Sequence, residues 1–230
     1  MRRLGVLGGT FDPVHLGHLR SALEVAAAFD LDRVLLVVSA RPPHKDARSA
    51  ASAADRLAMV RLAVAGEPRL EASAIEVDRP GPSWTVDTLR EVAGSFPGAE
   101  LFLILGIDAW MEIDTWSRPA EIPALANVIV TSRPGHAGVD EAPRPPFAAL
   151  ADARYDPAIG FFVHTSGHVI HGHRLRGLEV SATEVRRLAA HGLPFEHLTG
   201  ASVARYILDH HLYGAGLDDA LPGPHGEETP

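Results

Sequence analysis

Short runs of consecutive apolar residues, each as long as a β-strand, constrain the fold of this chain more than any other feature. They lie at residues 4–7, 33–38, 101–105 and 127–131. A strand that is apolar at consecutive positions is buried on both faces, which is typical of a parallel sheet covered by helices. Residues 17–29 separate the first two runs and carry apolar side chains at helical spacing. This order predicts an α/β protein with a doubly wound parallel sheet.

The remaining elements continue the same alternation, with one segment left open. Helices are predicted at residues 55–65, 85–96, 181–190 and 202–212, and a strand at residues 70–77. Residues 136–176 show little periodicity beyond a candidate strand at residues 159–163. We predict a single domain over residues 1–213, which ends in a helical part. The polar, Gly- and Pro-rich residues 214–230 are expected to form a disordered tail.

The composition argues against several classes of protein. Apolar residues make up 46% of the chain and charged residues 22%, so the chain can form a real core. A net charge of −8 argues against a nucleic-acid-binding surface, which needs a dense basic face. The sequence has no cysteine, which rules out disulfides, thiolate metal sites and a thiol nucleophile. It shows neither a membrane-length apolar stretch nor a signal peptide, so a cytoplasmic protein is expected.

The loop after the first predicted strand carries the strongest functional signal. It reads GGTFDPVHLGH, from Gly8 to His18. Gly8 and Gly9 let a ligand approach the backbone and tolerate positive φ. A helix beginning near Gly17 would point its free N–H groups back at this loop, where they favour an anion. His15 and His18 are three residues apart, so both can face that anion. The combination predicts a phosphate site; the alternative is a glycine turn beside two surface histidines.

A second helix start, near the C-terminus, offers further phosphate contacts. Residues 180–186 read VSATEVR and open the helix predicted at residues 181–190. Ser181 and Glu184 also have the spacing of a capping box, which explains both by helix initiation alone. Arg186 could equally belong to a solvated face. By itself, this segment favours helix initiation and a solvated face. Beside the first motif, a second helix N-terminus that faces phosphate is the better interpretation.

The first of these motifs, His15-Leu16-Gly17-His18, resembles the HxGH signature of a nucleotidyltransferase superfamily with a Rossmann-like fold. Residues 180–186 resemble the second signature of the same family, apart from Ala182, which replaces a hydroxyl residue. The resemblance implies that His15, His18 and Arg186 are catalytic and stabilise the departing pyrophosphate of ATP. It also implies ATP contacts from Gly8, Gly9, Thr10, Phe11, Gly106, Asp108, Ser181 and Thr183.

Three further segments resemble the nicotinate mononucleotide adenylyltransferases of that superfamily. They are Pro43-His44-Lys45, GPSWTVDTL from Gly81 to Leu89, and Gly106-Ile107-Asp108 followed by Asp114-Thr115-Trp116. Trp84 stands where the family has tyrosine. The loop Arg133-Pro134-Gly135 fits the family as well. The resemblance implies that nicotinate mononucleotide is bound by Lys45, Trp84, Thr85, Trp116 and Arg133.

These residue types suit a pyridine mononucleotide. The rings of Trp84 and Trp116 can stack on a pyridine ring, and Lys45 can meet a phosphate. Asp108 can accept hydrogen bonds from a ribose, and backbone N–H groups around Thr85 and Trp116 can hold the nicotinate carboxylate. Each residue also has an ordinary interpretation: the tryptophans as core packing, Lys45 as a loop cation and Asp108 as a helix cap.

The family resemblance implies transfer of the adenylyl group of ATP to nicotinate mononucleotide. Mg²⁺ would be bound mainly through the substrate phosphates, with no metal site built by the protein. ATP and the mononucleotide are the expected partners, without nucleic acid or membrane, and a homo-oligomer is left open. The alternatives are another acceptor, such as nicotinamide mononucleotide, or a non-catalytic nucleotide-binding module.

A group of histidines near residue 170 raises the question of a metal site. It comprises His164, His168, His171 and His173. Neutral imidazoles bind zinc, but no cysteine and no helical pair with an acidic residue supports these histidines. We therefore expect exposed histidines in a loop or strand.

Overall fold

One sheet of eight strands lies at the centre of the computed structural model, which describes residues 2–40, 51–132, 152–158, 161–176 and 180–216. The strands are β1 (Arg3–Gly9), β2 (Arg33–Val38), β3 (Leu70–Ser73), β4 (Glu100–Gly106), β5 (Asn127–Ser132), β6 (Ala153–Asp156), β7 (Phe161–His164) and β8 (Val169–Arg174). Their order is β3-β2-β1-β4-β5-β8-β7-β6. Six of them are parallel, and β7 and β6 continue the sheet antiparallel at one edge. The predicted α/β fold is confirmed.

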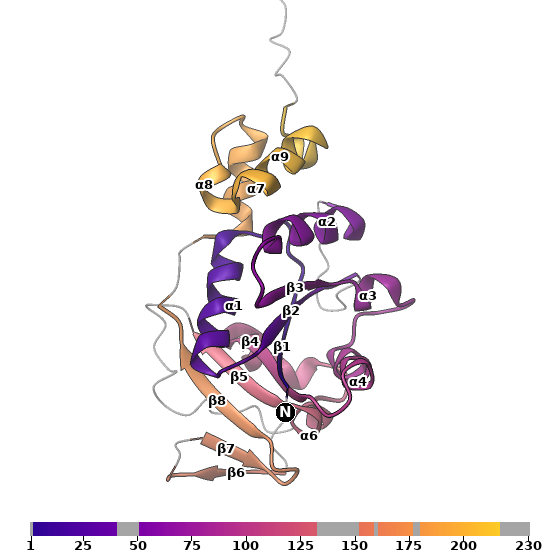
Figure 1. Ribbon diagram of the computed structural model, residues 1–230, viewed down its shortest axis with the longest axis vertical. Coiled ribbons are helices and arrows are strands. Elements are labelled where there is room, and N and C mark those ends of the chain that lie inside the picture. Colours follow the sequence, from indigo (N-terminus) through magenta and orange to yellow (C-terminus); the bar gives the residue numbers. More distant parts are fainter. Residues whose placement is uncertain (1, 41–50, 133–151, 159–160, 177–179, 217–230) are drawn as a thin grey trace, which may run out of the picture.

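Helices flank the sheet, and a group of them forms a cap beyond the end of α1 (Figure 1). The α-helices are α1 (Leu16–Ala28), α2 (Ala53–Val64), α3 (Ile75–Asp78), α4 (Thr85–Ser95), α5 (Ile107–Met111), α6 (Ile122–Leu125), α7 (Ala182–Ala190), α8 (Glu196–Thr199) and α9 (Ala201–Asp209). Short 3₁₀ turns are η1 (Ile113–Thr115), η2 (Pro119–Glu121) and η3 (Leu212–Gly214). The cap consists of α7, α8, α9 and η3 and is the predicted C-terminal helical part.

The strand order reverses beside β1, which pairs in parallel with β2 on one side and β4 on the other. Chain connections leave in opposite directions at such a point, so a crevice opens outside the carboxyl ends of the two central strands. Here those ends are Gly9 and Gly106. The fold therefore fixes where a ligand site is expected before any side chain is considered.

Alternate residues of each strand supply two hydrophobic clusters, one on each face of the sheet. In β4, Phe102 and Ile104 belong to the cluster that packs against α1, α2, α7 and α9. Leu101, Leu103 and Leu105 belong to the cluster that packs against α4, α5 and α6. This is why the strands are apolar at consecutive positions: both faces are covered, and each buried side chain contributes about 1.5–3 kcal/mol.

The prediction of a strand over residues 70–77 is correct for its first half and wrong for its second half. β3 ends at Ser73, and α3 begins at Ile75. The Ser73 hydroxyl accepts a hydrogen bond from the Ile75 amide at 3.4 Å, an interaction that turns the chain out of the sheet. The turn brings Glu76 inward, where it is 6% exposed. Local apolar spacing does not reveal this change of direction.

The poorly readable segment 136–176 contains three strands within its described part. The candidate strand at residues 159–163 corresponds to β7, although residues 159–160 lie outside the described residues. The expectation of exposed histidines is wrong, since His164 is 7% exposed and the others are partly buried. β8 lies between β5 and β7, and the rings of Phe29 and Phe161 pack against His171 at 5.2 and 4.8 Å.

The chain remains folded slightly beyond the predicted end of the domain. Gly214 completes η3, and Ala215 is fully buried. The rest of the predicted tail, residues 217–230, lies outside the described residues. Among the helices that are described, none is both long and apolar enough to cross a membrane.

Candidate active site

A cavity of about 400 Å³ opens at the carboxyl ends of β1, β2 and β4, where the strand order reverses. Several residues predicted from sequence line it together: Gly8, Gly9, Thr10, Trp84, Thr85, Gly106 and Trp116. They come from three separate stretches of sequence. The cavity therefore joins the predicted phosphate loop to the segments predicted to bind the mononucleotide.

Of the two glycines of the first loop, only Gly9 is required by close packing, and neither has an unusual backbone conformation. The left-handed conformation falls on Phe11, with φ 49°, and not on Gly8 or Gly9 as expected. A Cβ atom at Gly9 would lie 2.9 Å from the Phe11 ring, so only glycine fits there. A Cβ atom at Gly8 would meet nothing within 4 Å and would point into open space. The 3% exposed Phe11 ring thus supports the loop from the core.

His15 and His18 lie side by side at the start of α1. Their rings stack with centroids 3.7 Å apart and planes 22° from parallel. The backbone N–H of His15 donates to Nδ1 of His18 at 3.3 Å, so Nδ1 is the acceptor. A neutral His18 then carries its proton on Nε2, which can donate to a phosphate oxygen. His15 is 4% exposed, so His18 is the more accessible of the pair.

Arg186 reaches this loop from the opposite end of the chain. Its Nη1 donates to the carbonyl oxygen of Asp12 at 2.6 Å, across a separation of 174 residues. Its Nη2 donates to the Thr183 hydroxyl at 3.2 Å. The tertiary structure therefore brings both signatures together. Arg186 contacts the first loop and does not lie on a face that meets only solvent.

The structure supports the ordinary interpretation as a helix cap for Ser181 but not for Asp108. Ser181 caps α7 by accepting the Glu184 amide at 3.2 Å. The Glu184 side chain does not complete a capping box with Ser181, because its carboxylate pairs with Arg187 at 2.7 Å. Asp108 is exposed in the short helix α5, whose N-cap is Gly106, so Asp108 is not the cap.

The acceptor side of the cavity is built from α4 and the turn that carries Trp116. Thr85 is the first residue of α4, and helix geometry leaves the first N–H groups without intrahelical acceptors. The Trp116 amide donates to the Ile113 carbonyl at 2.9 Å, and a carboxylate contact from the backbone around Trp116 stays a prediction. Arg118 pairs with Asp87 at 2.6 Å and thereby ties the segment after Trp116 to α4.

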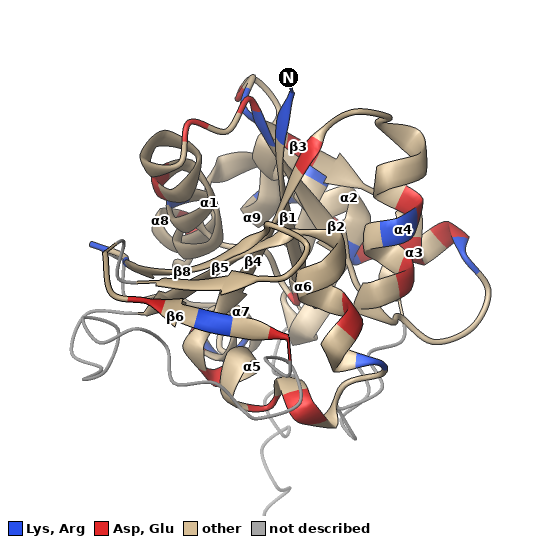
Figure 2. Cartoon of the chain, turned by 90° about the horizontal axis from the view of Figure 1, so that it is seen from below, with Lys and Arg blue, Asp and Glu red and all other residues tan. Residues whose placement is uncertain are grey.

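Charged side chains of both signs are interspersed around α3 and α4 (Figure 2). Arg90 pairs with Asp87 at 3.6 Å and also with Glu121, and Arg79 pairs with Glu91 at 2.9 Å. Such partly exposed pairs each contribute about 0–1 kcal/mol, so they add little to the stability of the fold.

Two buried charged residues were missed by the sequence analysis. Arg56 is 1% exposed and donates to the carbonyl oxygens of Thr10 at 2.6 Å and Ser39 at 2.7 Å. Glu76 lines the cavity and accepts hydrogen bonds from Ser39 at 3.1 Å and Thr88 at 2.6 Å. Burial lowers the pKa of Arg56, an effect that the charge of Asp12 opposes.

Of these two residues, only Arg56 could have been identified as buried from the sequence pattern. It lies three and four positions before the fully buried Met59 and Val60, on the apolar face of its helix. A charged residue on a buried face requires polar partners, which here are the carbonyl groups at the ends of β1 and β2.

Lys45 and Arg133 lie outside the described residues. Their predicted contacts with the mononucleotide therefore stay predictions. Within the described part of the chain, no three His, Asp or Glu side chains come together as a metal site would require.

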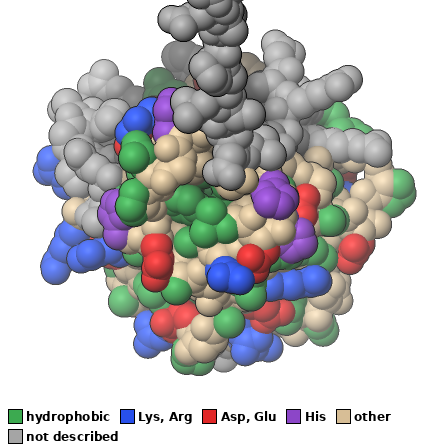
Figure 3. All heavy atoms as spheres, turned by 90° about the horizontal axis from the view of Figure 1, so that it is seen from above, with side chains coloured by type: hydrophobic (Ala, Val, Ile, Leu, Met, Phe, Trp, Pro, Cys, Tyr) green, Lys and Arg blue, Asp and Glu red, His purple; other side chains and the backbone are tan. Residues whose placement is uncertain are grey.

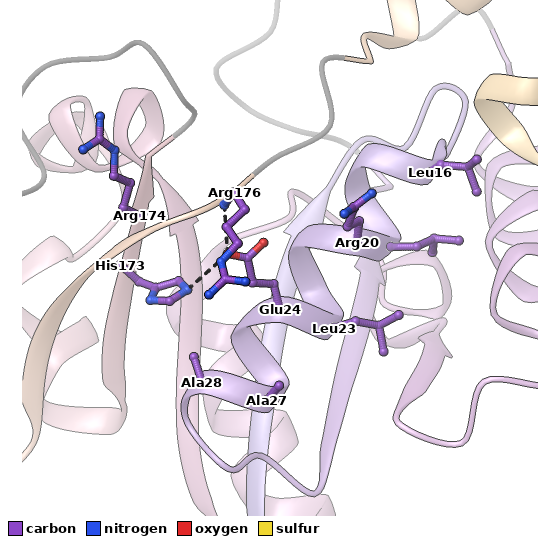
Figure 4. A pocket seen from close by; sticks show the side chains of 10 residues that line it. Leu16, Arg20, Leu23, Glu24, Ala27, Ala28, His173, Arg174 and Arg176 are labelled. Carbon is purple, nitrogen blue, oxygen red and sulfur yellow. Dashed lines mark hydrogen bonds and ion pairs between the residues drawn. The ribbon is translucent and has the colours of Figure 1, made fainter.

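A second and larger groove lies between α1 and the chain that leaves β8. Figure 4 shows Glu24 of α1 facing His173 and Arg176 across it. Glu24 lies 3.9 Å from Nε2 of His173 and accepts the Arg176 amide at 2.8 Å. Of the residues predicted to bind substrate that the structure describes, none lines this groove. The end of the molecule that carries the cap mixes apolar, acidic, basic and histidine side chains (Figure 3).

Comparison with known proteins places this site in a family. Residues 6–188 match the family described as cytidylyltransferase-like. A protein of Desulfatibacillum aliphaticivorans named probable nicotinate-nucleotide adenylyltransferase is 42% identical over 219 residues, which span 92% of this chain and 99% of the relative. A protein of the same name from Thermus thermophilus is 41% identical over 211 residues, again with 92% and 99% covered.

Solved structures agree on the fold. Plasmodium falciparum nicotinic acid mononucleotide adenylyltransferase, complexed with NaAD, aligns with a TM-score of 0.67 and 15% identity, over 95% of this chain and 100% of that one. The motifs, the site at the strand reversal and the relatives lead to one conclusion. The chain belongs to the cytidylyltransferase-like family and, within it, to the nicotinate-nucleotide adenylyltransferases, which are nucleotidyltransferase enzymes.

Proposed function

We propose that this chain transfers the adenylyl group of ATP to nicotinate mononucleotide, giving nicotinate adenine dinucleotide and pyrophosphate. The observation that carries the proposal is one continuous site. The loop of His15 and His18, joined by Arg186, lies at the end of β1, and the same β1 end lines the cavity with Trp84 and Trp116. The names of the relatives support the choice of substrates.

The reaction requires alignment and charge stabilisation more than proton transfer. A phosphate oxygen of the mononucleotide attacks the α-phosphorus of ATP, a new P–O bond forms, and the bond to the β-phosphate oxygen breaks. The attacking group is already an anion at neutral pH, so no general base is needed. Negative charge grows on the departing pyrophosphate, to which His18 and Arg186 would donate hydrogen bonds.

The expected Mg²⁺ is proposed to arrive with ATP. Within the described residues there is no cluster of carboxylates or histidines that could enclose it. Bound to phosphate oxygens and water, it would neutralise part of the phosphate charge.

The acceptor is proposed to bind between the two tryptophans. The pyridine ring would stack on the exposed parts of Trp84 and Trp116, which both line the cavity. The free amides at the start of α4, at Thr85, would hold the nicotinate carboxylate. This arrangement favours the acid over the amide, because an anion gains more than a neutral group from a helix N-terminus.

The test is pyrophosphate release from ATP and Mg²⁺, with nicotinate mononucleotide and nicotinamide mononucleotide assayed side by side. We expect a strong preference for the acid. An equal or reversed preference would retain adenylyl transfer but overturn the acceptor. Absence of release with either substrate would overturn the proposed activity and leave a nucleotide-binding module.

A further inference from the structure

Asp12 connects three distant parts of the chain to the loop between β1 and α1. Its Oδ1 accepts hydrogen bonds from the Tyr213 hydroxyl at 2.8 Å and from the Ala51 amide at 3.2 Å. Its carbonyl oxygen accepts Nη1 of Arg186 at 2.6 Å. Asp12 is 9% exposed and lies three residues before His15. Any shift of Asp12 would therefore be transmitted to a proposed catalytic histidine and to Arg186 together.

Tyr213 provides the longest of these connections. It belongs to η3, near the end of the described chain, and its contact with Asp12 spans 201 residues. Its backbone is left-handed, with φ 60°, a conformation that a bulky side chain adopts only at a cost in free energy. The surrounding structure holds the hydroxyl at Asp12 despite that cost. Burial, together with the hydrogen bond to Asp12, raises the pKa of Tyr213, so its hydroxyl stays a donor.

Arg56 also holds the same loop through a hydrogen bond to its backbone. Its guanidinium holds the carbonyl oxygens of Thr10 and Ser39 and lies within the electrostatic influence of Asp12. The two residues that hold the loop come from different parts of the fold. Arg56 belongs to α2, which covers the sheet, whereas Tyr213 belongs to the C-terminal cap. The position of the loop thus depends on the cap being docked.

We propose that Tyr213 is a positioning residue for adenylyl transfer, which acts through Asp12 to set the loop of His15 and His18 and the guanidinium of Arg186 against ATP. The inference rests on the function proposed above. It assigns to the C-terminal end of the chain a role in the chemical step, without any contact between Tyr213 and substrate.

A second tyrosine of the cap provides a matched control. The Tyr206 hydroxyl donates to Oδ1 of Asp55 at 3.0 Å and also ties the cap to the rest of the fold. Asp55 lies at the start of α2, and no contact joins it to the loop of Asp12 among those described. Tyr213→Phe and Tyr206→Phe therefore each remove one tyrosine–aspartate hydrogen bond, but only the first touches the catalytic loop.

The experiment compares steady-state kinetics of the two full-length variants with ATP, Mg²⁺ and nicotinate mononucleotide. For Tyr213→Phe we expect kcat to fall about tenfold, the loss typical of one hydrogen bond to a charged group, with the KM for the mononucleotide changed by less than about twofold. Tyr206→Phe should keep the wild-type kcat. Equal effects of the two variants, or a wild-type kcat in Tyr213→Phe, would overturn the inference.

Hydrogen exchange separates this inference from the proposed function. Without substrate, amides of residues 10–18 should exchange faster in Tyr213→Phe than in wild type and at the wild-type rate in Tyr206→Phe. Unchanged exchange in Tyr213→Phe would overturn the inference. Absence of pyrophosphate release in the wild-type protein would overturn the proposed function, whereas the exchange comparison would still decide whether Tyr213 holds the loop.

Discussion

The two halves of the candidate site are held in place by different forces. The phosphate half, around Asp12, His15 and His18, is fixed by hydrogen bonds from residues far away in sequence, among them Arg56 and Arg186. The acceptor half is shaped by the packing of Trp84 and Trp116, by the start of α4, and by an ion pair between Asp87 and Arg118.

This difference matches the chemistry that each half is proposed to perform. Stabilising charge on a departing pyrophosphate demands donors at fixed positions, because electrostatic stabilisation depends on preorganised geometry. Holding an aromatic ring demands a surface of the right shape, which tolerates small displacements. Substitutions in the phosphate half should therefore act on kcat and those in the acceptor half on KM.

The largest effect is expected from His18→Ala. Loss of the Nε2–H donor should lower kcat by about 10²–10³, the range for one charge-stabilising group, with a smaller change in KM. Pyrophosphate release at saturating substrates measures it. The exposed His197 of α8 provides a control, since His197→Ala should leave kcat unchanged. Near-normal turnover in both His18→Ala and His15→Ala would contradict the assigned role of the phosphate half.

Arg56→Met should cause the next largest change, and it should act on stability. The substitution leaves the carbonyl oxygens of Thr10 and Ser39 without their buried donor, so unfolding in urea should become easier by about 3 kcal/mol. Arg61→Met, at an exposed position of the same helix, should change stability by less than about 0.5 kcal/mol. Similar losses for both variants would show that Arg56 does not hold the two strand ends.

Trp116→Ala tests the acceptor half. Removing the ring should raise the KM for nicotinate mononucleotide about tenfold, the size expected from a lost stacking contact, while the KM for ATP stays nearly constant. Both constants can be measured with the same pyrophosphate assay. A rise confined to the KM for ATP would place Trp116 in the wrong half of the site.

The smallest effect concerns His171, which lies outside both halves. Burial lowers its pKa from the ordinary value of 6.5, Arg3 adds to the shift, and Glu100 opposes it. The unfolded chain then binds this proton more readily than the folded one, so folding stability falls as the pH drops below about 6.5. Urea unfolding at about pH 7.5 and about pH 5.5 measures this change. The loss of folding stability at the lower pH should be smaller in His171→Gln than in wild type. An unchanged difference between the two pH values would show that His171 does not contribute.

The sequence by itself determined the fold class and identified the loop between β1 and α1 as the predicted phosphate site. Apolar runs of strand length can be read locally because burial on both faces of a sheet leaves no polar alternation. The first loop can be read for a similar reason: Gly9 and His18 act on neighbours within a few residues. The helix start at Ser181 was also local, and its capping role was among the interpretations weighed.

Tertiary structure decided everything that depends on contacts between distant residues. The contact of Arg186 with the loop between β1 and α1 was shown by its hydrogen bond to Asp12. The sequence pattern likewise showed none of three further features: Glu76 lines the cavity, His171 is packed against Phe29, and Tyr213 donates a hydrogen bond to Asp12. Periodicity reports which face of an element is buried, whereas the partner that it meets there is set by chain topology, which no local pattern encodes.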